Sequence, residues 1–396
     1  LQRFFESDEL KEIGGRAYLY DLAASAVTVI NAGEYGRLVY DLYLKRELIA
    51  LGEDVVNRAY GGDVEETATD QIEKAEQNLY DLAVTDVDTD RPGLEPVSRF
   101  IDATLAEIKA AAQGDGPVGL PTGLHDLDRM TGGLMPSDLV VVAARPGMGK
   151  TALAGTFAKA AAVRGKRVGF FSLEMSERQM LMRLLAMESG IAASEMRTGE
   201  VTNAQMSAIE SAAQSVAALP IMLDGQTGIP VSAIRHRARR MKRQGSLDLV
   251  IVDYLQLIDP GNRYQGQRVN EVAQISGAMK GLAKELNVPV VLLSQLSREV
   301  ERRDDKRPHL SDLRDSGSIE QDADVVLLLY RESYYLEMDG PPKARTGESD
   351  DHYADRMAKW ERERRDAEGT AKIIVAKQRN GRTGVVDVHF NAQRTI

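Results

Sequence analysis

A glycine-rich stretch is the part of this sequence best suited to chemistry. Residues 144–151 read ARPGMGKT, and they lie between the apolar run 139–143 and the alanine-rich run 152–154. A strand, a glycine loop and a helix in this order form a phosphate-binding loop, because backbone N–H groups and the positive end of the helix converge on phosphate oxygens. Ala144 stands where the usual pattern has Gly. The pattern nevertheless predicts a nucleotide site, at which Lys150 reaches the terminal phosphates and Thr151 holds Mg²⁺.

Three further apolar runs end in polar side chains that could serve the same site. Asp253 ends the run 249–253 and would hold Mg²⁺ through the water shell of the ion. Glu174 follows another run and is the candidate general base, because Asp253 would already be engaged with the metal. Gln295 could bond the γ-phosphate and report its presence to the next loop. Ligand sites gather where parallel strands end, although each residue taken alone could be an ordinary surface residue.

Several arginine-rich segments offer contacts to phosphate. The segments 298–308 and 311–318 combine Arg with small residues, which favours a close approach of backbone to phosphate, although a solvated loop is the default for each. Lys377 and Arg379 follow a strand and suit the stabilisation of phosphoryl charge, in this subunit or an adjacent one. The most basic run, 235–243, has a helical wheel that is charged all round. We interpret it as a solvated helix or a subunit face rather than a DNA groove.

The elements that must position these residues alternate between strands and helices. This alternation predicts an α/β fold with a mainly parallel twisted sheet. An Asn-Gly turn at 380–381, flanked by apolar runs, predicts an antiparallel strand pair near the C-terminus. The expected parallel strands are 139–143, 167–172, 249–253, 288–294 and 324–330, and the expected antiparallel pair is 371–376 with 385–390.

The rest of the chain divides into three kinds of segment. Residues 1–84 have helical periodicity, with an expected hairpin at 16–60 and a helix at 70–84, and predict a partial helical domain. Residues 85–118 are expected to form a linker with a helix. That helix has an apolar stripe that packs on its own domain or on a neighbouring subunit. The core is expected at 119–396, and its charge-dense part at 333–369 is interpreted as a solvated insertion.

Composition narrows the class of protein. The chain has 396 residues, 43% of them apolar, no cysteine and a net charge of −10. The absence of cysteine excludes a disulfide framework, an Fe–S cluster and a thiolate zinc site, and it agrees with a cytoplasmic location. No apolar run approaches membrane-spanning length. The negative charge argues against a generally basic, nucleic-acid-coating surface, so any such site must be local.

The motifs in combination resemble those of the bacterial replicative DNA helicase family, DnaB. The resemblance covers residues 119–396, and the helices before it are less specifically similar to the later half of the N-terminal domain of that family. The matching motifs, in order, are 144–151, 172–175, 253–256, 294–298, 312–317 and 377–379. The resemblance implies a RecA-like fold, a homohexameric ring, ATP and Mg²⁺ as cofactors, and movement along single-stranded DNA. It also implies primase and a helicase loader as partners of the N-terminal region.

The resemblance also implies roles for individual residues. Arg183, on the helix after Glu174, touches nucleotide. Arg298, from the arginine-rich segment 298–308 described above, is a further DNA-contact candidate. Asp315 stands where Glu is common, so a side-chain contact there is less certain than a backbone contact. The phosphate-binding residues are Gly147, Gly149, Lys150 and Thr151, the remaining DNA-loop residues are Arg314, Asp315 and Gly317, and the finger that reaches a neighbouring subunit is Lys377, Gln378 and Arg379.

Two other functions remain open at this point. One is a RecA-like recombinase or another RecA-fold ATPase without unwinding activity. The other is a non-hydrolysing module in which the P-loop only switches conformation while the helical region recruits partners. The intact Glu174 argues against the second, and the DNA-loop and finger motifs favour a helicase over the first.

Overall fold

The computed structural model describes residues 32–61, 96–113, 118–260, 266–313, 317–346 and 348–391, with isolated helical positions between 68 and 82. The chain separates into two compact units, residues 1–101 and 102–396. The first arm of the expected hairpin, the polar linker 85–95, and both Arg314 and Asp315 lie outside the described residues.

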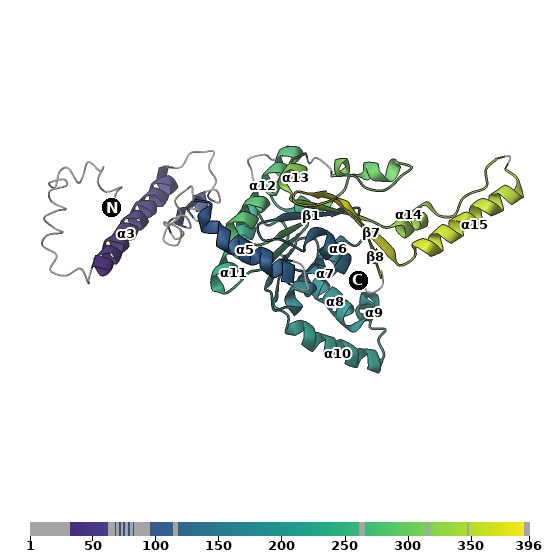
Figure 1. Ribbon diagram of the computed structural model, residues 1–396, viewed down its shortest axis with the longest axis horizontal. Helices are drawn as coiled ribbons and strands as arrows, with labels where there is room; N and C mark the ends of the chain where they lie inside the picture. The colour runs from purple at the N-terminus through teal and green to yellow at the C-terminus, as the bar shows by residue number, and fades with distance from the viewer. Residues whose placement is uncertain are drawn as a thin grey trace. The chain divides into compact units, whose positions relative to one another are not determined.

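Two long helices precede the first strand of the sheet in the chain (Figure 1). They are α3, Ala32–Gly61, and α5, Ser98–Gln113. Helix α3 ends where the glycines at 61–62 predict. The apolar stripe expected on the linker helix is exposed, from Val97 and Phe100 to Leu105 and Ile108.

Within the described residues, eight strands form one sheet in the order β3-β2-β4-β5-β1-β6-β7-β8. Strands β3 to β6 in that order are parallel, and β7 and β8 pair antiparallel at one side. This confirms the predicted fold class. The strands are β1 Leu139–Ala144, β2 Val168–Ser172, β3 Ile221–Asp224, β4 Leu249–Asp253, β5 Val290–Gln295, β6 Val325–Tyr330, β7 Thr370–Gln378 and β8 Gly384–His389.

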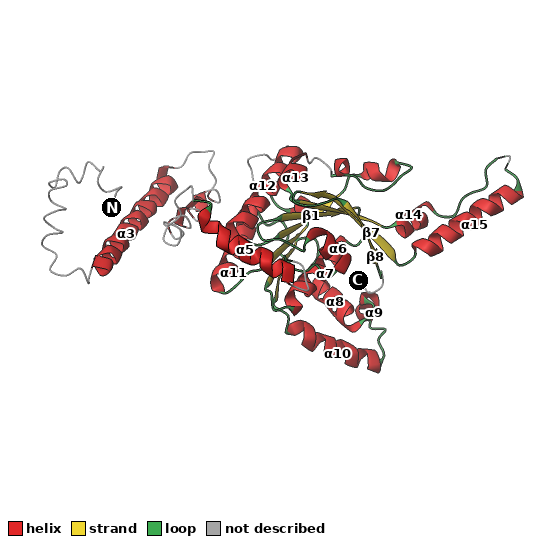
Figure 2. Ribbon diagram, in the orientation of Figure 1, coloured by secondary structure: helices red, strands yellow, loops and turns green. Residues whose placement is uncertain are grey.

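Helices cover both faces of this sheet (Figure 2). Successive residues of the buried strand β1 point to opposite faces, so Val141 belongs to the apolar cluster that includes residues of α11 and α12, whereas Val142 belongs to the cluster that includes residues of α7. Both faces need apolar residues, which is why β1 reads LVVVAA without alternation. The helices are α6 His125–Thr131, α7 Lys150–Val163, α8 Glu177–Ser189, α9 Ala193–Thr198, α10 Asn203–Ala217, α11 Val231–Gln244, α12 Arg268–Leu286, α13 Gly317–Asp322, α14 Glu332–Asp339 and α15 Asp350–Ala367, with short 3₁₀ turns η3 Leu255–Leu257, η5 Arg298–Arg302 and η6 Leu310–Asp312.

The prediction that the basic run 235–243 is charged all round its helix was wrong. Helix α11 buries Ile234, Ala238 and Arg239 on one side. The guanidinium of Arg239 is held by Glu285, with Nη2 2.8 Å from Oε2. An ion pair therefore allows an arginine to occupy a buried position, which a wheel of charges alone does not reveal.

The segment 333–369, interpreted above as a solvated insertion, contains most of helix α14 and all of helix α15. Helix α14 lies against β7, and α15 buries only Ala367 among its own residues. Ser349 caps α15, and Glu348 binds Arg356 at 2.7 Å. Trp360 is half-buried beneath the guanidinium of Arg364.

Candidate active site

The glycine-rich stretch forms a tight loop between β1 and α7. Gly147 and Gly149 have φ angles of 79° and 99°. Residues that carry a Cβ rarely adopt a backbone conformation in this region. Gly149 is the N-cap of α7, and no side chain of the described residues caps that helix. The first N–H groups of α7 are therefore oriented toward a ligand at its positive end.

This loop borders a cavity of about 260 Å³ at the carboxyl ends of the parallel strands. The cavity gathers residues predicted from four separate parts of the sequence, including Glu174, Arg183 and Gln295. Its lining consists of Arg145, Pro146, Gly147, Gly149, Lys150, Thr151, Ala152, Glu174, Met175, Arg183, Tyr254, Gln295, Arg331 and Phe390.

Asp253 lies beside this cavity and is fully buried. Its Oδ2 accepts a hydrogen bond of 2.7 Å from Thr151 Oγ1, whereas its Oδ1 has no hydrogen-bond partner among the described residues. Burial raises the pKa of Asp253, and Thr151 and Lys150 act in the opposite direction. Asp253 thus offers a carboxylate oxygen that has no hydrogen-bond partner in the described part of the chain, next to the hydroxyl of Thr151. These oxygen ligands fit a divalent cation.

Lys150 and Arg183 lie in the cavity near the carboxylates of Asp253 and Glu174. Burial lowers the pKa of Lys150, while Asp253 and Glu174 oppose that change. Burial likewise lowers the pKa of Arg183, against the same two carboxylates. The ammonium of Lys150 stands 4.5 Å from the centre of the Tyr254 ring. Since partly desolvated cations are stabilised by a bound anion, phosphate is complementary to this arrangement.

The sequence analysis missed two residues of the cavity. Arg331 Nη1 donates to the carbonyl oxygen of Gly147 at 3.1 Å, and its guanidinium stacks 4.2 Å from the centre of the Phe390 ring. A Cβ added to Gly149 would lie 2.8 Å from Phe390 Cε2. Arg331 directly follows β6, so the strand-end rule that found Gln295 also applies to it. Phe390 follows an antiparallel strand, and the sequence contains no comparable signal for it.

Gln295 is bonded to the turn after β4 and is adjacent in the chain to the segment that follows β5. Its backbone N–H donates to Gln256 Oε1 at 3.2 Å, and Gln256 Nε2 donates to Ser294 Oγ at 3.1 Å. The next residue, Leu296, forms an antiparallel bridge with Leu313. Gln295 therefore lies one residue from the segment that leads to the expected DNA loop.

The described DNA-contact candidates lie outside the cavity. Arg298 is exposed at the start of η5, and Gly317 begins α13.

The finger residues do not meet the P-loop of their own chain. Gln378 pairs with Val325, which in turn pairs with Val140, near the start of β1. The P-loop follows the other end of β1, four residues or about 13 Å away. Lys377 Nζ donates to Ala323 O at 2.7 Å and Arg379 Nη2 donates to Gln321 O at 2.8 Å. The structure thus separates Lys377, Gln378 and Arg379 from the other predicted nucleotide-binding residues.

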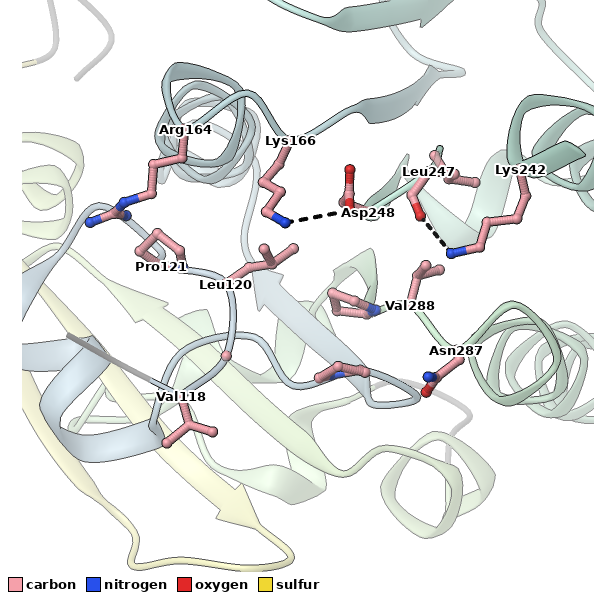
Figure 3. Close-up of a pocket in the computed structure, with 13 residues that line it drawn as sticks. Val118, Leu120, Pro121, Arg164, Lys166, Lys242, Leu247, Asp248, Asn287 and Val288 are labelled. Atoms are coloured by element: carbon pink, nitrogen blue, oxygen red, sulfur yellow. Dashed lines mark hydrogen bonds and ion pairs between the residues drawn. The ribbon is translucent and has the colours of Figure 1, made fainter. Parts of the chain in front are cut away.

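A second pocket of about 440 Å³ opens near the amino ends of the strands (Figure 3). Lys166 there faces Asp248 at 3.9 Å, and Lys242 donates to Leu247 O at 3.1 Å. None of the predicted site residues belongs to the described lining of this pocket. Lys166 and Lys242 are already engaged with acceptors, so the size of this pocket alone does not make it the active site.

A mainly parallel sheet, a glycine loop before α7 and a buried strand-end aspartate define a RecA-like P-loop ATPase. Residues 119–396 match the family model described as the DnaB-like helicase C terminal domain. The chain is 44% identical to the replicative DNA helicase DnaB of Rickettsia bellii, over 99% of this chain and 80% of that protein. The corresponding protein of Geobacillus stearothermophilus is 38% identical over 97% of this chain and 78% of its own length.

Solved structures of helicases and ATPase domains are also similar to this chain. A DnaB-like replicative helicase described with its primase interactions matches with a TM-score of 0.69 and 30% identity, over 98% of this chain and 84% of that one. A second solved structure, described as an ATPase domain, matches with a TM-score of 0.64 and 33% identity, over 75% of this chain and 97% of that one. The chain belongs to the DnaB family of replicative helicases and is an ATP-dependent DNA helicase. The family uses a nucleotide and a divalent metal.

No helix in the described part of the chain is long and apolar enough to cross a membrane.

Proposed function

We propose that this chain is one subunit of a homohexameric ring that couples ATP hydrolysis to movement along single-stranded DNA and thereby separates a duplex. The observation that carries the proposal is the distance between Arg379 and the cavity of its own chain. The side chain of Arg379 is 49% exposed, so it is available to a neighbour. A ring supplies that neighbour to every subunit.

Each residue of the cavity receives a role in this proposal. Gly147, Gly149 and Lys150 hold the phosphates, and Arg183 adds a second cation. Thr151 and Asp253 hold Mg²⁺, which when bound offsets charge on the phosphate oxygens. Glu174 positions and deprotonates the attacking water, because it is the cavity carboxylate that is not paired with Thr151. Gln295 contacts the γ-phosphate, and Arg379 with Lys377 acts on the neighbour's nucleotide.

The DNA contacts are proposed for the loop beside Gln295. The side chains of Arg298 and Arg314, and the backbone of Asp315 and Gly317, would meet DNA phosphates rather than base edges, as a motor that moves through any sequence requires. The net charge of −10 makes a local site necessary. The bridge between Leu296 and Leu313 connects that site with the nucleotide sensor.

One similar structure supports the proposed contact with primase. That structure is described with primase interactions, and we propose that the N-terminal unit of this chain contacts primase and a helicase loader. As a replicative helicase it would work in the cytoplasm, where the bacterial chromosome lies. The exposed stripe of α5 supports a contact with a neighbouring subunit. The family membership argues against the recombinase and the non-hydrolysing module.

The test is ATP hydrolysis and unwinding of a forked duplex, each measured with and without single-stranded DNA. The proposal predicts DNA-stimulated hydrolysis, unwinding, and ring-shaped particles in the presence of nucleotide. Lys150→Ala should abolish both activities, whereas Lys159→Ala, a change on the same helix outside the cavity, should retain them. Unwinding by a protein that stays monomeric with nucleotide and DNA would contradict the ring.

A further inference from the structure

Arg145 of the P-loop has a side chain that reaches the loop after β5. Only 7% of this residue is exposed. Its Nη1 donates to the carbonyl oxygen of Leu296 at 2.9 Å, and its Nε lies 2.7 Å from Glu301 Oε1. One planar guanidinium therefore joins the nucleotide-binding loop to two points of a separate segment.

The segment that receives these bonds is the base of the proposed DNA loop. Leu296 bridges Leu313, and Ser297 N–H donates to Asp312 O at 2.8 Å. Asp312 is itself buried and accepts hydrogen bonds from Arg303 and from the N–H of His309. Leu313 directly precedes Arg314 in the chain. A displacement of Leu296 should therefore move Leu313, because backbone hydrogen bonds join the two segments.

We infer that Arg145, held by Glu301, is a positioning residue that transmits nucleotide binding at the P-loop to the DNA-contacting segment after Leu313. The inference rests on the proposed function. A nucleotide that orders the backbone of residues 145–149 also orders the guanidinium of Arg145, and through it the carbonyl of Leu296. If bound nucleotide increases the affinity for DNA by some factor, thermodynamic linkage requires that bound DNA increases the affinity for nucleotide by the same factor. Lysine could not replace this arginine, because a single ammonium lacks the fixed fork that spans both acceptors.

Glu301 is the better residue to change because it lies outside the cavity. Its side chain is 27% exposed, on the 3₁₀ turn η5. Glu301→Gln keeps the shape and one acceptor oxygen but removes the charge that orients Arg145. Glu299→Gln is the matched control, since Glu299 lies on the same turn and binds the exposed Arg302 at 3.1 Å.

The experiment measures affinities on the intact chain. The dissociation constant of a fluorescent, non-hydrolysable ATP analogue is measured with and without oligo(dT), and that of labelled oligo(dT) with and without the analogue. We expect a coupling factor of about 5 to 150 in the wild type. Glu301→Gln should lower that factor by about 2- to 30-fold while the affinity for the analogue without DNA stays unchanged. Glu299→Gln should retain the wild-type factor.

Arg145→Lys provides the second variant, and it should lose coupling to the same extent whether it is made alone or together with Glu301→Gln. A wild-type coupling factor in both Glu301→Gln and Arg145→Lys would overturn the inference. An equal loss of analogue affinity with and without DNA in Glu301→Gln would also overturn it, since that result describes a purely structural role. If the wild type itself binds no single-stranded DNA, the proposed function fails instead, and the two failures are thereby distinguished.

Discussion

The two ends of the sheet are both rich in charge, yet they differ in what the charges contact. At the carboxyl ends of the strands, Lys150 and Arg183 face carboxylates across a cavity, and one oxygen of Asp253 has no partner among the described residues. At the amino ends, Lys377 and Arg379 donate to backbone carbonyls. The comparison shows that a binding site is indicated by polar groups that lack partners and point toward one cavity. A high density of charged residues does not indicate one by itself.

The largest effect is expected from Arg379→Ala. If Arg379 acts on the neighbour's nucleotide, its loss removes transition-state stabilisation worth about 10³- to 10⁵-fold in rate. Nucleotide binding should persist, because the cavity of the same chain does not include this residue. Steady-state hydrolysis and binding of a fluorescent analogue provide the two measurements.

Mixed assemblies then sharpen the comparison of the two ends. Arg379→Ala subunits combined with Glu174→Gln subunits should regain part of the hydrolysis wherever an intact Arg379 meets an intact Glu174. Arg382→Ala is the control for loss of an arginine, since Arg382 is exposed and lies three residues later. This variant should hydrolyse ATP without mixing. Mixed rings that show no recovery would assign Arg379 a role within its own chain.

Glu174→Gln should have the second-largest effect. The change keeps the size of the side chain but removes the base, and loss of a general base costs about 10²- to 10⁴-fold in rate. Binding of ATP and single-stranded DNA should remain. Glu177→Gln, three residues later and outside the described lining of the cavity, is expected to hydrolyse ATP normally. Wild-type turnover by the Glu174 variant would transfer the base to another residue.

A pair of glycine substitutions tests how tightly the loop is held. Gly149→Ala and Gly165→Ala both place a Cβ at positive φ, which costs about 1–2 kcal/mol. At Gly149 the Cβ also meets Phe390 at 2.8 Å, whereas nothing lies within 4 Å at Gly165. Urea unfolding should therefore show a larger loss for Gly149→Ala, by about 1 kcal/mol. Equal losses would mean that Phe390 moves aside freely.

The smallest effect concerns Asp138 at the amino end of β1. Burial, followed by the neighbouring Asp324, raises the pKa of Asp138 to about 6. The folded state thus holds the proton more tightly than the unfolded state, so the stabilising contribution is full below pH 3.8 and is lost as the pH rises through 6. Asp138→Asn should therefore be more stable than the wild type at pH 8, by about 1 kcal/mol once the half-exposed position is taken into account.

This difference should shrink as the pH falls toward 4, and chemical unfolding at several pH values measures it. Asp126→Asn, a change of the same kind at an exposed position on α6, is the control substitution. A larger gain for Asp138→Asn at pH 4 than at pH 8 would contradict the raised pKa.

Local patterns were sufficient for most of the sheet. Apolar runs of five or six residues ending in polar groups located the parallel strands, and the Asn-Gly turn located the antiparallel pair. Strand β3 was missed because it has only four residues, none of them fully buried, at the edge of the sheet. The face buried by α11 was missed because Glu285, 46 residues away, neutralises the buried Arg239.

The sequence by itself determined the glycine loop, the strand-end residues Asp253, Glu174 and Gln295, and the order of the strands along the chain. These depend on local periodicity and on residue types whose chemistry is the same in any surroundings. Only the tertiary structure decided that Phe390 borders the cavity, that Arg145 reaches Leu296, and that Arg379 lies at the opposite end of the sheet. Those outcomes depend on which strands become neighbours and in what register, and the pairing of β7 with β6 is a contact between segments that are far apart in the chain.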